Sequence, residues 1–445
     1  MKKQHRIRPV VGTLAVAFSS LTTLQAGEGF YEAASGYQNY FPSGEGTPTY
    51  ASPYSNLPLT TYSYFNRPWN LPSENGVEFL AGLNFGYSGN INYEIYNPHD
   101  SSFYQVNAGL RGLWSNGRTR FGYELGVTGT RYDDGIDRDE HDKSMYDFVA
   151  HTRLRHEVGS SSVFYNDTYL HQGAHASLRN NIIWPGVQQK DFFNWRSTSQ
   201  LAWRTDGQPE FSTGWQQRSS VYYGGFRQDG DDWYDSYRVS VSHEAQYITS
   251  PGKGWFGVGE YGMRDFKQMG DYNSDSLRLG GGHFGTLPCG AHYRLEAGLQ
   301  QLDYDNSHYP KRDELYVNSS IYGTLARVDY RLFLNYGIHQ DFVNWGGGNF
   351  VDPIGTKAGL TLSVQASDKL RLGFNFSGQS LEADSTPAAN ARLGFYSAGI
   401  NAIYKLDENS ELNLDLGIHR VSFDNGGVGK SDTFGTILGG YTLKF

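Results

Sequence analysis

The sequence predicts an all-β protein, folded as one transmembrane antiparallel up-and-down β-barrel of about 18 strands with long loops at one end and short turns at the other. Two patterns and the composition lead to this fold class. Apolar and polar residues alternate along successive segments from Val77 to Phe445, and the breaks between the segments alternate long and short. The chain combines 15% aromatic residues and 55 glycines with a mean hydropathy of −0.56. Strands with one apolar face and aromatic belts at both membrane interfaces have this composition.

Residues 1–26 have the pattern of an export signal that is removed from the mature protein. Four basic residues within the first eight precede an apolar run from Val10 to about Leu24, and Ala26 then stands before Gly27. The run is shorter than the roughly 20 apolar residues that a spanning helix needs; a buried N-terminal helix is the alternative. Without this segment 33 Lys and Arg face 46 Asp and Glu. That acidic balance argues against nucleic-acid binding, which leaves a basic footprint.

Residues 27–76 do not follow the strand pattern. They are rich in Tyr, Pro, Ser and Gly, as in the run from Tyr62 to Trp69. We expect irregular or extended chain on the periplasmic side. A tether, a plug inside the barrel and a docking segment remain open for it.

Period-two alternation predicts the strands of residues 77–445 in order. The expected strands are Val77–Ser88, Tyr104–Trp114, Arg120–Arg131, Tyr146–Glu157, Val163–His171, Phe193–Arg204, Phe211–Tyr223, Tyr237–Tyr247, Trp255–Phe266, Leu277–Thr286, His292–Leu302, Glu314–Gly323, Arg327–His339, Lys357–Ala366, Lys369–Ser380, Arg392–Lys405, Glu411–Val421 and Thr433–Phe445. In Val163–His171 the simplest register turns Asp167 toward lipid, so this strand has the weakest pattern.

The breaks predict which end of the barrel faces which compartment. Turn sequences such as Asn116-Gly117 and Asp206-Gly207 fill the short breaks. The long breaks are polar and are 97–103, 132–144, 174–190, 227–235, 306–313, 342–352 and 424–432. If the last strand ends in the periplasm, every long break is extracellular and every short one is periplasmic.

The two faces of single strands distinguish a membrane barrel from a soluble β-sandwich or propeller. In Lys369–Ser380 one face carries Leu370, Leu372 and Phe374, whereas the other carries Lys369 and Arg371. A soluble sheet also alternates, but its strands do not need the 9 to 11 residues with which a tilted strand crosses a bilayer. A propeller would repeat a signature about every 40 residues, and no such repeat is visible.

The end of the chain carries a short signature. Tyr441, Leu443 and Phe445 alternate with Thr442 and Lys444 up to the last residue. With Gly440, this ending resembles the C-terminal strand of Gram-negative outer-membrane β-barrel proteins of the porin type. In that family the corresponding positions are an insertion signal read by the barrel-insertion machinery. The resemblance extends over residues 77–445 through the strand pattern and implies an outer-membrane location among lipid and lipopolysaccharide.

A barrel of about 18 strands is too wide for its own side chains to fill, so we expect a water-filled lumen unless a plug occupies it. Assigning the polar faces inward gives a wall with more basic than acidic residues. The expected inward basic residues are Arg111, Arg120, Arg153, Arg155, Arg196, Arg204, Arg218, Arg238, Arg264, Arg278, Arg294, Arg327, Arg331, Lys357, Arg371 and Lys405. The expected inward acidic residues are Glu78, Glu124, Asp147, Glu157, Glu244, Glu260, Glu296, Asp329, Glu411 and Asp415.

Two interpretations of this wall remain open. The arginines could bind carboxylate or phosphate groups of anionic solutes, or they could pair with the inward acids and brace the wall. No G-x-S-x-G, H-E-x-x-H, P-loop or Cys/His metal spacing occurs, so we expect neither an enzyme nor a bound metal or other cofactor. Acidic runs such as 133–140 lack the spacing of a calcium-binding EF-hand. The single Cys289 excludes an internal disulfide.

Resemblance to porins implies passive passage of small hydrophilic solutes, anionic ones among them. The strand count and arginine-rich wall are also similar to 18-stranded exopolysaccharide exporters, such as the alginate exporter, which would imply guidance of an anionic polysaccharide. A non-conducting barrel that anchors or binds a partner is the third alternative. The sequence does not fix the oligomeric state.

Overall fold

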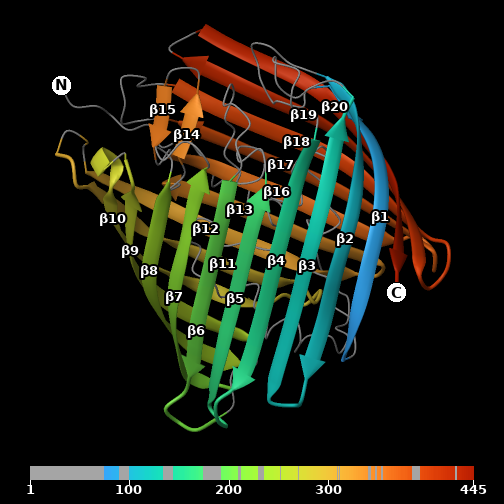
Figure 1. Cartoon of the computed structure of the whole chain (residues 1–445). Coiled ribbons are helices and arrows are strands. Elements are labelled where there is room, and N and C mark those ends of the chain that lie inside the picture. The colour runs from blue at the N-terminus through green and yellow to red at the C-terminus, as the bar shows by residue number, and fades with distance from the viewer. Residues whose placement is uncertain are drawn as a thin grey trace.

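The protein is a barrel of long antiparallel strands (Figure 1), seen here in a computed structural model. The structure describes residues 75–89, 100–133, 144–173, 192–208, 212–228, 235–250, 252–268, 270–307, 309, 311–338, 342–345, 348–351, 354–382, 391–425 and 428–445. The predicted signal of residues 1–26 and nearly all of the 27–76 segment lie outside the described residues, as do most of the acidic runs at 133–140 and 229–232.

Eighteen of the twenty described strands form one sheet. They are β1 Gly76–Ser88, β2 Ser101–Ser115, β3 Thr119–Tyr132, β4 Ser144–Glu157, β5 Ser162–Gly173, β6 Phe192–Trp203, β7 Gly214–Gln228, β8 Ser236–Ser250, β9 Lys253–Phe266, β10 Ser274–Thr286, β11 His292–Tyr304, β12 Arg312–Leu325, β13 Val328–Ile338, β16 Ile354–Gln365, β17 Leu370–Glu382, β18 Ala391–Lys405, β19 Ser410–Asn425 and β20 Val428–Lys444. The other two, β14 Phe342–Trp345 and β15 Gly348–Val351, pair only with each other.

The barrel closes between its first and last strands. β1 pairs antiparallel with β20 from Leu80↔Lys444 to Ser88↔Thr436. Beyond that ladder, the Phe79 N–H donates to the Phe445 carbonyl at 3.1 Å, and the Phe445 N–H donates to the Phe79 carbonyl at 2.9 Å. Every other strand of the ring pairs with its neighbours along the chain. The predicted up-and-down barrel of about 18 strands is therefore confirmed.

Connections of different length gather at the two ends of the barrel. At what we call the turn end, successive strands are joined by 2 to 10 residues, whereas at the loop end the connections reach 18 residues. Gly117 and Gly207 adopt φ values of +85° and +73° in two predicted turns at the turn end, a conformation that glycine reaches without steric cost. Which end faces the periplasm stays a prediction.

Several details differ from the sequence-based prediction. The expected polar break 342–352 contains the β14–β15 hairpin. The expected break 424–432 is mostly strand, because β19 and β20 continue to pair up to Asn425↔Val428. Simple alternation from Leu334 would put Ile338 on the outer face of its strand, but Ile338 packs with Phe266, Leu302 and Tyr304. The chain reverses the face at Gly337, whose φ is +147°.

The two faces of the barrel differ in polarity. Exposed outer side chains are apolar on nearly every strand, for example Phe85, Leu299 and Ile418, which are 60%, 62% and 63% exposed. Buried polar side chains occupy the inner face, with apolar clusters nearer the two ends, such as Ile248, Phe256 and Phe284. The wall is therefore less uniformly ionisable than predicted. Within the described part of the chain, no helix has the length and apolarity to cross a membrane.

Candidate functional site

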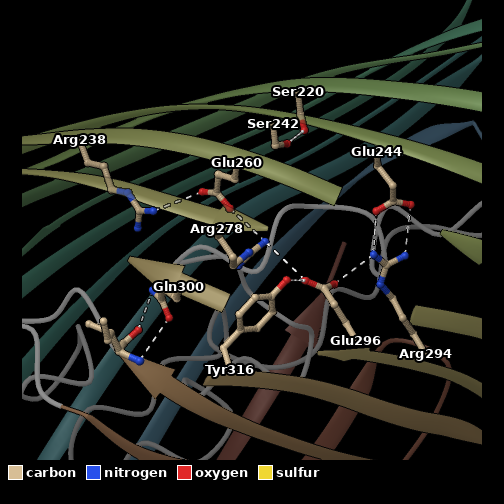
Figure 2. Close-up of polar contacts among 11 residues, drawn as sticks. Ser220, Arg238, Ser242, Glu244, Glu260, Arg278, Arg294, Glu296, Gln300 and Tyr316 are labelled. Atoms are coloured by element: carbon tan, nitrogen blue, oxygen red, sulfur yellow. Dashed lines mark hydrogen bonds and ion pairs between the residues drawn. The ribbon is translucent and has the colours of Figure 1, made fainter. Parts of the chain in front are cut away.

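The largest group of charged side chains on the inner face lies on β8 to β11 (Figure 2). Arg278 binds Glu260 at 3.0 Å and approaches Glu296 at 3.8 Å. Arg294 binds Glu244 at 2.7 Å and Glu296 at 3.2 Å. The five side chains thus form alternating charges, in which each arginine contacts two carboxylates.

The strand register explains why these charges meet. Arg278 on β10 stands directly opposite Glu260 on β9, and Arg218 on β7 stands opposite Glu244 on β8. Opposite charges at facing positions of neighbouring strands attract. Arg238 on β8 faces the like-charged Arg264 on β9, and its Nη2 instead reaches Glu260 at 3.3 Å.

Two of the arginines make cation–π contacts with aromatic rings. The Tyr316 hydroxyl donates to Glu296 at 2.9 Å, and the Arg278 guanidinium lies over the Tyr316 ring at 5.2 Å from its centroid. The Arg294 guanidinium lies 3.6 Å from the centroid of the Phe256 ring. Sequence reasoning missed Tyr316 and Phe256. The available signal was position, since Tyr316 alternates in phase with the polar Glu314 and Asn318.

We call the inner face of β7 to β12 the charged wall. Its charged side chains are Arg218, Arg238, Glu244, Glu260, Arg264, Arg278, Arg294, Glu296, Arg312 and Glu314. Six guanidinium groups thus face four carboxylates among its described residues. The pairs are held out of bulk water, as Arg218 and Glu260 are only 2% and 4% exposed. In this setting removal of one partner would leave a buried charge.

The inner face of β17 to β20, β1 and β2 has a different chemistry, and we call it the amide wall. Its amide side chains are Asn84, Gln105, Asn107, Asn375, Gln379, Asn401 and Asn413. Several lie over glycines of the next strand: a Cβ on Gly440 would overlap the Asn84 Oδ1 and come within 2.8 Å of the Asn413 Oδ1. β9 and β20 are nine strands apart in the ring of eighteen, so the two walls face each other across the barrel.

Most of the predicted wall residues with described side chains are on the inner face. Arg218, Arg238, Arg294, Glu244 and Glu296 belong to the charged wall. Arg111 pairs with Glu78 at 2.6 Å, and Arg155 pairs with Glu157 at 2.8 Å. Asp415 is buried at 4% exposure. Lys357 stands opposite Gln379 on β17, and Arg371 lies 3.9 Å from Asp329.

The remaining predicted residues divide into three cases. Arg327 is not in a strand, because β12 ends at Leu325 and a turn of 326–327 precedes β13. Glu124, Arg153, Arg196 and Arg331 occupy inward strand positions by register, but their side chains lie outside those described. At the C-terminus, Tyr441 and Phe445 are outward, at 37% and 70% exposure, whereas Gly440 lies beneath inner-face amides. Their role in insertion stays a prediction.

Asp167 corrects the predicted register of β5. It is 5% exposed, faces inward, and both carboxylate oxygens lie 3.0 Å from the His151 Nε2. The outward positions on either side of it are Asn166 and Thr168. Val163, Tyr165 and Tyr169 share the inner face with Asp167 and are also buried, so apolar content misidentified the lipid-facing side of this strand.

His419 is the most buried histidine contact described on the amide wall. The His419 ring contacts the Ser397 Oγ at 2.9 Å and the Thr436 Oγ1 at 3.0 Å, and all three side chains are buried, at 3% to 5% exposure. Within the described ranges, no group of three or more His, Cys, Asp or Glu residues could hold a metal ion.

A closed barrel of 18 antiparallel strands with an apolar outer and a polar inner surface is the architecture of outer-membrane β-barrels, and the chain has this architecture. No protein-family model matches it, and no curated protein matches it. Its fold is similar to solved structures at low identity. The outer membrane protein opdK from Pseudomonas aeruginosa is 9% identical, with a TM-score of 0.44 and coverage of 83% of this chain and 99% of that one.

Two further solved structures are also similar in fold at low identity. OccAB4 from Acinetobacter baumannii is 10% identical, with a TM-score of 0.41 over 84% of this chain and all of that one. A mutant of the ferric enterobactin receptor PfeA from Pseudomonas aeruginosa is 8% identical, with a TM-score of 0.43 over 85% of this chain and 82% of that one. These TM-scores are too similar to favour one of the three proteins as a guide to function. The function is therefore argued from the residues of the charged wall.

Proposed function

We propose that the barrel is a passive channel for small hydrophilic solutes and that its charged wall favours anionic ones. The observation that carries the proposal is the excess of six guanidinium groups over four carboxylates on β7 to β12. A lumen wall with surplus positive charge raises the local concentration of anions. Guanidinium groups also match the planar geometry of carboxylates and phosphates.

Bracing and solute binding are compatible in this wall. Arg278 and Arg294 each contact two carboxylates, and these pairs fix the wall in place. Arg238 contacts Glu260 at 3.3 Å, and Arg278 neutralises the same carboxylate at the shorter distance of 3.0 Å. Replacement of Arg238 would therefore remove a positive charge and still leave Glu260 with an ionic partner.

Solute flux into liposomes tests the proposal. We expect swelling of liposomes that contain the full-length mature chain in a neutral pentose, faster swelling in an anionic sugar acid of similar size, and slower swelling in a cationic amine. Arg238→Gln should lower the anion-to-neutral rate ratio by roughly twofold, since it removes about half of the surplus charge. Equal rates for all three solutes would contradict the anion preference.

The matched control is Arg227→Gln on the neighbouring strand. Arg227 is exposed and its guanidinium lies 5.5 Å from the centroid of the Trp195 ring on the outer face. We expect its replacement to leave the rate ratios unchanged. Absence of swelling in every solute would favour the anchoring barrel, and a block of flux by an acidic polysaccharide would favour the exporter.

A further inference from the structure

The outer face of β4 to β8 carries a group of polar side chains, whereas the rest of the described outer wall is apolar at mid-strand apart from Ser319 on β12. We call this group the polar patch. It consists of Thr152, Asn166, Thr168, Ser197, Ser199, Gln217, Ser219 and His243. On the other strands the corresponding mid-strand positions hold residues such as Leu279, Leu332, Phe376 and Leu416.

The patch lies at the depth of the hydrocarbon core. On β6 the serines Ser197 and Ser199 are flanked on the same face by Trp195 toward the loop end and by Trp203 toward the turn end. On β8, His243 is seven residues from each end of the strand. At about 3.3 Å per residue and a tilt near 40°, it lies roughly 18 Å from either end. A lipid headgroup cannot reach this depth, so any polar partner must itself be embedded in the membrane.

Side-chain hydrogen bonds order one half of the patch. The Asn166 Nδ2 donates to the Ser199 Oγ at 3.0 Å and to the Ser197 Oγ at 3.3 Å. The Thr168 hydroxyl donates to the Asn166 Oδ1 at 3.1 Å. Four side chains from two strands therefore present hydroxyl and amide groups in a fixed arrangement.

The other half is arranged around His243. Its Nε2 lies 3.0 Å from the Gln217 Oε1, and its Nδ1 lies 2.9 Å from the Ser219 Oγ. Because the Gln217 Oε1 can only accept, the His243 Nε2 donates to it. The Trp203 ring packs near His243 with 5.8 Å between centroids.

We propose that the polar patch is the contact face between two copies of this chain, related by a two-fold axis along the membrane normal. Polar groups in hydrocarbon cost free energy unless they are hydrogen-bonded, and membrane interfaces are enriched in small and hydroxyl-bearing residues for this reason. Hydroxyls and amides both donate and accept, so the patch is complementary to itself. A two-fold axis along the normal brings each residue to its counterpart at the same depth.

A cyclic ring of three or more copies fits the outer wall less well. Such a ring joins two different faces of each subunit. Apart from Ser319, the described outer faces of β9 to β13, β16 to β20 and β1 to β3 are apolar at mid-strand, so a ring would set the polar patch of one copy against hydrocarbon side chains of the next. Only the pairing of the patch with itself matches polar to polar.

Energy transfer between labelled copies in proteoliposomes tests the dimer. We expect a dimer for the unchanged chain over a range of lipid-to-protein ratios. Asn166→Leu with Ser197→Leu and Ser199→Leu should weaken it roughly tenfold or more while the barrel still folds, because leucine is what the rest of the outer wall contains. Ser319→Leu on β12 is the control. Ser319 is also outward and donates to the Leu334 carbonyl in the same sheet at 3.2 Å, away from the polar patch, so its loss should leave the dimer unchanged.

Cysteine cross-linking tests the symmetry. In a Cys289→Ser background, Ser199→Cys should form a disulfide with its own counterpart, and Leu334→Cys on the opposite side should not. A monomer at every lipid ratio, a trimer, or a dimer that is insensitive to the triple leucine variant would overturn the proposal. Cross-links from Ser199→Cys only to a cysteine placed on another face would overturn it as well.

Discussion

The charged wall and the amide wall both order buried polar side chains on the inner face of the barrel, but they do so through different interactions. Both are inner faces of six strands, and both keep polar groups buried. On the charged wall, Arg278, Arg294 and their carboxylates are joined by ion pairs across strands. On the amide wall, Asn84 and Asn413 pack over the bare backbone of Gly440. The charged wall is therefore sensitive to the loss of one charge, and the amide wall is sensitive to added volume.

The comparison also bears on solute passage. A solute crossing the barrel meets surplus guanidinium groups on one side and, on the other, amides together with paired charges such as Arg111 and Glu78. Hydroxyl and amide groups such as Thr128 and Asn107, which are joined at 2.8 Å, bind without selecting charge. Charge selection in our proposal must then come from the β7 to β12 side, where Arg238 is the replaceable charge.

The largest expected effect is on the charged wall. Arg294→Met removes the 2.7 Å ion pair of Glu244 and the 3.2 Å ion pair of Glu296, and we expect a loss of about 3 to 5 kcal/mol of unfolding free energy. Adding Glu244→Gln should recover part of it, because one of the two buried charges is then removed. Denaturant unfolding in lipid bilayers measures both variants.

An exposed ion pair provides the control for that variant. Arg392 binds Glu382 at 2.9 Å, with the two side chains 63% and 55% exposed. Arg392→Met should cost less than about 1 kcal/mol. Equal losses for Arg294→Met and Arg392→Met would show that the pairs of the charged wall do not brace it.

A smaller effect is expected on the amide wall. Gly440→Ala would place a Cβ against Asn84 and Asn413, and overpacking of this kind costs about 1 to 3 kcal/mol. Gly435→Ala on the same strand is the matched control, since its Cβ would meet only the Gly417 carbonyl at an ordinary 3.8 Å. If both substitutions have the same effect on unfolding, the packing of amides over glycine is not what orders this wall.

The smallest effect is expected at a turn outside both walls. Arg204, whose side chain is fully buried, binds Asp206 and donates to the Thr213 carbonyl at 2.8 Å. The hydrogen bond from Arg204 lowers the pKa of Asp206 below its ordinary value of 3.8. A lowered pKa contributes stability above pH 3.8 that is lost as the pH falls through the folded-state pKa.

Replacement of Asp206 tests this contribution. Asp206→Asn should lower the denaturant midpoint slightly at pH 7, and the difference from the unchanged protein should shrink below pH 3.8, the ordinary value. Midpoints at pH 7 and pH 3 measure it. A difference that grows on acidification would mean that Asp206 does not act through its charge.

Much of the fold could be predicted because a membrane barrel repeats one pattern. Leu370, Leu372 and Phe374 are outward and Arg371 is inward, as their alternation indicates. The prediction failed where both faces of a strand have mixed character. In β5, the inner face carries Tyr165 and Tyr169, an aromatic content that is typical of a lipid-facing surface. The contact between Asp167 and His151 on β4 shows that this face is the inner one.

The site was predicted in its residue types and not in its contacts. Arg278, Arg294, Glu260 and Glu296 were expected to face inward, but alternation in one strand does not say which arginine meets which carboxylate. That depends on the register between strands, which places Arg278 opposite Glu260. Tyr316 was missed because an aromatic residue in a barrel strand is usually outward, although its phase with Glu314 and Asn318 places it on the polar face.

The most direct test of the central claim is the reversal potential of the purified chain in planar bilayers under a salt gradient, with and without residues 27–76. We predict ion conductance with a reversal potential that indicates anion selectivity, and a shift toward zero for Arg238→Gln but not for Arg227→Gln. Cation selectivity would contradict a solute preference set by the charged wall. No conductance in either form of the chain would contradict the channel itself.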